Sequence, residues 1–79
     1  MTEPVRVDLY TRADCPLCDE AKEVLSRGLR GTPHRLVEHD VAADPALKAL
    51  YGDEIPVVVV DGVKRFAGRV NPVLLRRLF

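Results

Sequence analysis

Aromatic residues are scarce in this chain, and neither sign of charge is in excess. Tryptophan is absent, two tyrosines and two phenylalanines are present, and 12 basic residues balance 12 acidic ones. A net charge of zero gives no general reason to expect nucleic acid or a membrane surface as a partner. No apolar run approaches the roughly 18–20 residues that cross a bilayer, and no signal-peptide pattern opens the chain. We therefore expect a cytoplasmic protein with neither nucleic acid nor membrane among its partners.

Cysteine is equally scarce, and the two that are present, Cys15 and Cys18, lie close together in the run TRADCPLCDEAKEVL. A structural disulfide is unusual in cytoplasmic proteins. One that closes so short a loop would also stabilise the fold little, because the loop-closure entropy shrinks with loop length. The pair is therefore a redox couple, part of a metal site, or two small apolar residues at the start of a helix.

The length limits the architecture to one domain. A chain of 79 residues buries only roughly 60–65% of its unfolded surface on folding. The core is therefore thin, and an active site is expected at the surface. Because no repeat, linker or low-complexity segment divides the sequence, we predict a single domain over residues 1–79.

The spacing of apolar residues changes repeatedly along the chain. Alternation with a period of two predicts strands at residues 5–10 and 34–41, and the run PVVVV at 56–60 predicts a strand buried on both faces near the middle of a sheet. Asp61 and Gly62 predict a hairpin turn into a short strand at 64–67. Helical spacing from residue 16 places on one face Leu17, Cys18, Ala21, Val24, Leu25 and Leu29.

Two more helices are predicted from their end signals. Asp44 is the expected N-cap of a helix that stops at Gly52, and a last helix begins at residues 71–72. The leucines expected to face inward from the last helix are Leu74, Leu75 and Leu78. The resulting order, β-α-β-α-β-β-α, with a right-handed βαβ unit, predicts a three-layer α/β sandwich around a four-stranded mixed sheet.

The predicted position of the cysteines gives each a different environment. Cys15 immediately precedes the helix that starts at Pro16, where free backbone N–H groups and the helix dipole stabilise a thiolate. Arg12 can add positive charge nearby. Cys18 lies one turn further along, on the apolar face, where we expect it to be shielded and protonated. An exposed attacking thiol and a shielded second thiol are what exchange through a mixed disulfide requires.

Three stretches of the sequence resemble the glutaredoxin family. They are LYTRADCPLC at residues 9–18, Ile55 and Pro56 before the valine-rich strand, and Asp61-Gly62 followed by FAG at residues 66–68. The match covers nearly the whole chain in order, and the run CPLCDEA resembles most the short glutaredoxin-like proteins of unknown function. The resemblance implies a thioredoxin fold and a thiol–disulfide oxidoreductase with Cys15 and Cys18 as the catalytic pair.

The resemblance also implies where a substrate binds. In these folds the peptide bond before the proline that matches Pro56 is cis, and this proline lies against the cysteines. The preceding residue, Ile55, offers its backbone N–H and C=O to a bound peptide or to glutathione. The other implied substrate-binding residues are Arg12, Pro16, Leu17 and Gly68.

The chain departs from glutathione-binding glutaredoxins at both ends of this surface. Those proteins follow two glycines with an acidic pair that grips the amino end of glutathione, whereas here Gly68 is followed by Arg69, which would repel that ammonium group. Leu17 also replaces the usual tyrosine of the cysteine motif. We therefore expect a protein disulfide as the better substrate, with a glutathione-mixed disulfide as the alternative. We expect glutathione or a thioredoxin-reductase-type enzyme as the reductant, and no bound cofactor.

Asp8 carries a further hypothesis. The run VDLY at residues 7–10 resembles VDFW of thioredoxin, in which the aspartate lies behind the cysteines and assists proton transfer. A carboxylate on the helix-facing side would have a raised pKa and could accept the proton of Cys18. Strand spacing also allows a structural interpretation, an Arg6–Asp8 ion pair on a thinly covered face of the sheet.

Two other interpretations of the chain stay open. Cys15, Cys18, His34 and His39 have the spacing C-x2-C-x15-H-x4-H, which falls within a zinc-site template. On one strand, however, the odd separation of the histidines puts them on opposite faces. We expect them to be solvent-facing residues of an edge strand, with no metal bound. The second alternative is a non-catalytic thioredoxin-fold module that binds a partner through the edge at Ile55 and Pro56.

Overall fold

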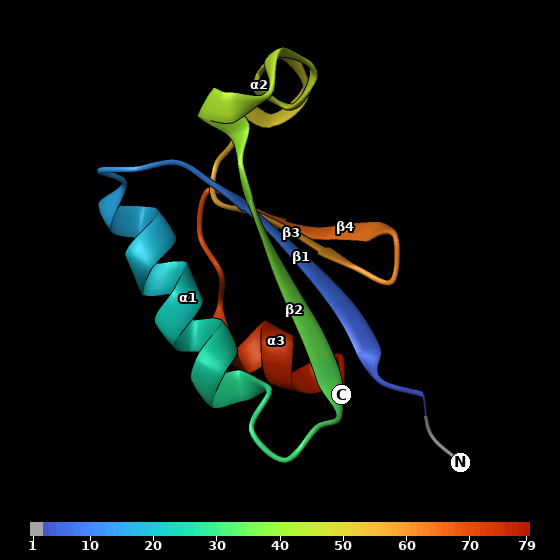
Figure 1. The fold of residues 1–79 in the computed structure, drawn as a ribbon. Helices are drawn as coiled ribbons and strands as arrows, with labels where there is room; N and C mark the ends of the chain where they lie inside the picture. The colour runs from blue at the N-terminus through green and yellow to red at the C-terminus, as the bar shows by residue number, and fades with distance from the viewer. Residues whose placement is uncertain (1–2) are drawn as a thin grey trace.

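The computed structural model describes residues 3–79, and within them four strands and three α-helices follow one another in the predicted order (Figure 1). None of these helices is long and apolar enough to cross a membrane. The elements are β1 (Val5–Thr11), α1 (Pro16–Gly28), β2 (His34–Asp40), α2 (Pro45–Tyr51), β3 (Val57–Val60), β4 (Val63–Ala67) and α3 (Pro72–Arg77), with a 3-10 turn, η1 (Val41–Ala43), before α2.

The four strands form one mixed sheet in the order β2-β1-β3-β4. β1 is parallel to β2 and antiparallel to β3, and β3 is antiparallel to β4. Asp61 and Gly62 turn the chain between β3 and β4 with positive φ angles of 47° and 83°, as a two-residue hairpin turn requires. All four valines of β3 are buried, because the strand lies inside the sheet. The predicted fold class, a thioredoxin-like α/β fold, is confirmed.

One face of the sheet carries the core. Val7 and Leu9 of β1 point toward this face and pack with Leu25 of α1 and Leu75 of α3, all four completely buried. α1 and α3 approach each other closely at Gly28, where a Cβ atom would overlap the Leu75 side chain. Full burial of each such side chain stabilises the fold by about 1.5–3 kcal/mol. α1 and α3 together therefore provide most of the cover of the sheet.

The opposite face is thinly covered. Arg6, Asp8 and Tyr10 alternate with the core residues of β1 and so lie on this face. Figure 1 shows α2 beyond the end of β2, away from α1 and α3. None of the residues of α2 (Pro45–Tyr51) is buried, because the helix extends past the sheet and does not lie flat on it. Polar side chains and Tyr10 cover this face, and α2 contributes only Tyr51 at its end.

Two leucines lie differently from their predicted positions. Leu74 was expected to face inward, but it is 49% exposed, because α3 is only six residues long and packs through Leu75. Leu17 was assigned to the apolar face of α1, but it is 41% exposed and lines a surface cleft, whereas Cys18 in the same turn is buried. The predicted cap is present: the side chain of Asp44 accepts hydrogen bonds from the first N–H groups of α2. The side chain of Asn71 does the same for α3, at the predicted start of that helix.

Candidate functional site

The two cysteines form a disulfide at the N-terminus of α1, with their Cα atoms 5.2 Å apart. Cys15 is the N-cap residue in an extended conformation, and its Sγ accepts a hydrogen bond of 3.2 Å from the backbone N–H of Cys18. Cys15 is 9% exposed and Cys18 is 1% exposed. Cys15 is therefore the sulfur nearer to solvent, and its environment, facing free helix N–H groups, is the one that favours a thiolate.

A surface cleft of about 420 Å³ opens beside Cys15. It is lined by five of the residues that the sequence assigned to the site, and Leu17 with its exposed side chain is one of them. The chain reaches the cleft from β1 through a loop in which Asp14 has a positive φ of 56°. The residues that line the cleft are Arg12, Asp14, Cys15, Pro16, Leu17, Gly52, Asp53 and Ile55.

The backbone around Ile55 forms one wall of the cleft. The bond between Ile55 and Pro56 is cis, as predicted. Gly68 lies beside this segment, since its N–H donates to the C=O of Glu54 at 2.8 Å and to that of Pro56 at 2.9 Å. The N–H and C=O of Ile55 have no backbone partner among residues 3–79, so both can pair with an extended chain laid along the cleft.

Gly68 leaves the surface open beside that wall. Its φ is +84°, and among the described residues no atom beyond its chain neighbours lies within 4 Å of the point where a Cβ would stand. A bound backbone can therefore approach closely here. Arg69, which follows, is exposed. The structure thus gathers Arg12, Leu17 and Ile55 around Cys15 and places Gly68 next to Ile55.

Comparisons with known proteins identify the family of the chain. The family model described as "Glutaredoxin-like domain (DUF836)" matches residues 6–79. The chain belongs to the glutaredoxin-like domain family. An uncharacterized protein of Mycobacterium tuberculosis is 39% identical over 96% of this chain and 82% of its own length.

Solved structures are similar to this glutaredoxin-like domain over nearly all of its length. A Nitrosomonas europaea protein has a TM-score of 0.83 and 20% identity, covering 99% of this chain and 94% of its own. This likeness concerns the fold alone. The glutaredoxin-like protein NrdH-redoxin of Escherichia coli has a TM-score of 0.66 and 28% identity, covering 94% of this chain and 95% of its own.

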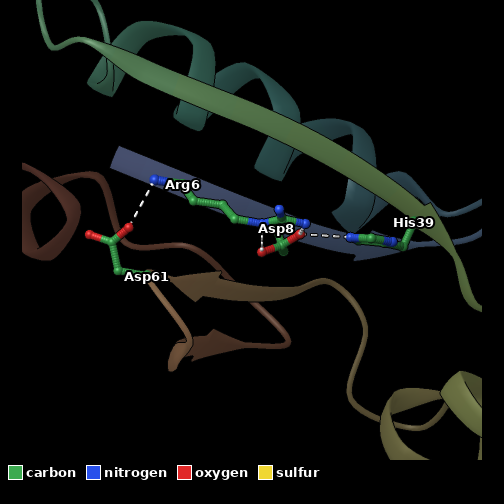
Figure 2. Close-up of polar contacts among 4 residues, drawn as sticks. All are labelled: Arg6, Asp8, His39 and Asp61. Atoms are coloured by element: carbon green, nitrogen blue, oxygen red, sulfur yellow. Dashed lines mark hydrogen bonds and ion pairs between the residues drawn. The ribbon is translucent and has the colours of Figure 1, made fainter. Parts of the chain in front are cut away.

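Asp8 of the glutaredoxin-like domain does not reach the cysteines. It lies on the open face of the sheet, opposite α1, and accepts hydrogen bonds from Nε and Nη2 of Arg6 at 3.0 and 3.1 Å and from Nε2 of His39 at 2.8 Å (Figure 2). The hydrogen bonds from Arg6 hold the pKa of Asp8 below its ordinary value, although burial acts in the opposite direction. A group that accepts the proton of Cys18 would have to lie on the side of the sheet that faces α1 and would have a raised pKa. The geometry therefore does not support Asp8 as that proton acceptor. The Arg6–Asp8 ion pair is what the structure contains.

The histidines of the domain lie in different environments. His34 is exposed and its Nδ1 donates to the C=O of Thr32 at 2.7 Å. His39 was expected to face solvent, and that prediction is wrong, because Asp8 and the stacked ring of Tyr10 hold it half-buried against the sheet. No group of three or more His, Cys, Asp or Glu side chains within residues 3–79 is placed to hold a metal ion. The geometry therefore does not support the zinc alternative.

Three residues of the cleft, Asp14, Gly52 and Asp53, were not among the predicted site residues. Gly52 and Asp53 also line a second cleft of about 360 Å³ that shares Arg12 and continues toward α2. The signal in the sequence was that these two residues closely precede Ile55, a predicted site residue. Their contribution depends on how α2 meets the cysteine loop, and this contact joins segments far apart in the sequence.

Proposed function

We propose that this glutaredoxin-like domain is a thiol–disulfide oxidoreductase that reduces protein disulfides through Cys15 and Cys18. The observation that carries the proposal is the disulfide at the N-terminus of α1, where Cys15 borders a surface cleft. The open backbone of Ile55 on the other side of that cleft supports an extended polypeptide as the substrate.

The proposed reaction proceeds through a mixed disulfide. The thiolate of Cys15 attacks one sulfur of the substrate disulfide, and the other substrate sulfur leaves and takes up a proton. Cys18 then loses its proton and attacks Sγ of Cys15, which breaks the mixed disulfide and releases the second substrate thiol. Two electrons and two protons pass to the substrate, and the Cys15–Cys18 disulfide remains. Glutathione or a thioredoxin-reductase-type enzyme would reduce it again.

Three features support a protein disulfide over a glutathione-mixed disulfide as the substrate. Arg69 is exposed directly after Gly68, where its charge would repel the ammonium group of glutathione. Leu17 offers an exposed apolar side chain beside Cys15. The similar NrdH-redoxin is described as a glutaredoxin-like protein with a thioredoxin-like activity profile. Because the reaction needs a compartment that returns the pair to its thiols, the proposal places the protein in the cytoplasm.

Serine variants test the reaction with insulin as the protein disulfide and dithiothreitol as the reductant. Cys15→Ser is expected to abolish insulin reduction. Cys18→Ser is expected to retain the first step and to accumulate a mixed disulfide with the substrate, detected by mass spectrometry. Equal turnover in wild type and Cys15→Ser would refute the proposal. A non-catalytic binding module would retain partner binding when both cysteines are replaced by serine and would show no turnover in the wild type.

A redox titration in thiol–disulfide buffers separates the two reductants. A midpoint near the glutaredoxin range of about −200 to −230 mV makes electron supply by glutathione favourable. A midpoint near about −270 mV, as in thioredoxin, favours a dedicated reductase. The absence of any two-electron transition would contradict the oxidoreductase proposal.

A further inference from the structure

The wall of the cleft that faces the cysteines is attached to a helix with no buried residue. Residues 52–55 follow directly after α2, and three of them, Gly52, Asp53 and Ile55, line the cleft. None of the residues of α2 (Pro45–Tyr51) is buried. Gly68 and Lys64 bind the far side of this wall through hydrogen bonds to Glu54. On the side of α2, the position of the wall depends on a small number of specific contacts between the end of the helix and the sheet.

The most specific of these contacts is a row of three rings across the open face of the sheet. Tyr51, the last residue of α2, packs on Tyr10 of β1 with ring centroids 4.5 Å apart. Tyr10 in turn stacks on His39 of β2, at 4.6 Å and an interplanar angle of 14°. Offset and tilted ring pairs at this separation attract each other beyond the effect of burial alone. The row therefore joins the end of α2 to the two adjacent strands of the sheet.

Polar contacts hold the far end of this row in place. Nε2 of His39 lies 2.8 Å from Oδ1 of Asp8, and Arg6 donates two hydrogen bonds to the same carboxylate (Figure 2). His39 therefore cannot turn freely, and Tyr10 stacks on a fixed ring. The side chains of Tyr10 and His39 are both partly buried, although the helix they contact is exposed.

The near end of the row is connected to the cleft by backbone hydrogen bonds. The C=O of Tyr51 accepts from the N–H of Glu54 at 2.9 Å, and the C=O of Glu54 accepts from the N–H of Gly68 at 2.8 Å. The chain between Tyr51 and Ile55 is thus one tight turn. A displacement of the Tyr51 backbone would move the open backbone of Ile55 relative to Cys15.

We infer that Tyr51 is a positioning residue, which holds the Ile55 wall at the distance from Cys15 that a substrate strand requires, through its ring contact with Tyr10 and the His39–Asp8 pair behind it. This inference rests on the proposed function for its kinetic consequence. Its structural consequence, the order of residues 52–55, does not depend on any activity.

The test compares three variants of α2. Tyr51→Ala removes the ring, Tyr51→Phe keeps it, and Leu50→Ala removes a neighbouring side chain that is 63% exposed. For insulin reduction, Tyr51→Ala is expected to raise KM by roughly 3- to 10-fold, the range that the loss of one aromatic pair predicts. Its kcat and the midpoint potential of the cysteine pair should stay at wild-type values. Tyr51→Phe and Leu50→Ala should keep the wild-type KM.

Amide hydrogen exchange provides the readout that needs no activity. In Tyr51→Ala the N–H groups of Glu54 and Gly68 are expected to exchange faster than in wild type, while those of the β1–β3 ladder are unchanged.

An unchanged KM together with unchanged exchange would overturn the inference. An equal effect in Leu50→Ala would also overturn it, because the cause would then be general loosening of α2. If the wild type does not reduce insulin, the proposed function fails and the exchange data alone decide this inference. Tyr51→Leu replaces Tyr51→Ala if the latter does not fold.

Discussion

The Nε2 atom of His39 lies 2.8 Å from Oδ1 of Asp8, which connects β2 to β1 through their side chains on the open face of the sheet. Asp8 is 7% exposed and also accepts two hydrogen bonds from Arg6. Removing one partner of a buried, hydrogen-bonded carboxylate leaves polar groups unsatisfied and destabilises the folded state. This cluster therefore has consequences for stability that can be measured separately from the chemistry of the cysteines.

Asp8→Asn is expected to destabilise the protein. The amide keeps the shape of the side chain but loses the charge and cannot accept from all three donors, which should lower the free energy of unfolding by about 1–3 kcal/mol. Urea denaturation followed by circular dichroism measures the change. The control is Glu23→Gln, which breaks the exposed pair with Arg27 on α1 and is expected to cost less than about 0.5 kcal/mol. Equal losses in the two variants would contradict the prediction.

The contribution of Asp8 is also expected to depend on pH. Its pKa is lowered in the folded protein, mainly by the hydrogen bonds from Arg6, so the unfolded chain binds this proton more tightly. The stabilisation is therefore present above the unfolded pKa of about 3.9 and is lost as pH falls through the lower folded value.

The measurement for this pH dependence is the free energy of unfolding of wild type and Asp8→Asn between pH 7 and pH 2.5. The difference between the two proteins should be constant near neutrality and should shrink in the acid range. The hydrogen bond with Lys22 also lowers the pKa of Glu38. Both proteins contain Glu38, so its contribution cancels in the difference between their free energies of unfolding. A difference that grows on acidification would have the wrong sign and would refute the assignment.

The two thiols of the reduced protein are expected to react at different rates. Cys15 caps α1 and borders the cleft, whereas Cys18 is 1% exposed beneath it. Iodoacetamide should therefore alkylate Cys15 at least about tenfold faster than Cys18 near neutral pH. Mass spectrometry of peptides from a short time course gives both rates. Comparable rates would show that the shielding of Cys18 is lost when the disulfide is reduced.

A side chain at Gly68 is expected to impair substrate binding. Gly68→Ala adds a methyl group to the surface that Gly68 leaves open and forces a non-glycine residue to keep a φ of +84°, which should cost about 1–2 kcal/mol of stability. Gly31 is a matched control, since its φ is +82° and its surroundings are equally open. Gly31→Ala should lower the stability similarly. Only Gly68→Ala should raise KM for insulin reduction, and an equal rise in both variants would mean that strain, not the site, is responsible.

Arg69→Glu is expected to shift the substrate preference toward glutathione. The substitution restores an acidic side chain directly after Gly68, where glutaredoxins that bind glutathione carry an acidic pair. The KM for reduction of a glutathione-mixed disulfide of a short peptide should fall several-fold, which is the change expected from about one favourable surface ion pair. The KM for insulin is the comparison. If neither value changes, the exposed charge of Arg69 does not govern substrate choice.

Local interactions in the sequence determined the elements and their order. The helices start where Asp44 and Asn71 can accept from free N–H groups, and the chain turns at Gly62 because two successive residues need positive φ. The valine run of β3 is central because it is apolar on both faces. The position of Cys15 before Pro16 likewise followed from neighbouring residues alone. Each of these features depends on contacts within a few positions along the chain.

The tertiary structure decided which face each side chain joins and what it meets there. Alternation along β1 separates Asp8 from Val7 and Leu9, but only the packing of α1 and α3 decides that Asp8 faces away from the cysteines. His39 is held half-buried because parallel pairing brings β2 beside β1. Likewise, Gly52 and Asp53 line the cleft directly after Tyr51, which contacts Tyr10 across the sheet. These contacts join residues some 31 to 41 positions apart, and periodicity within a single element carries no information about such distant partners.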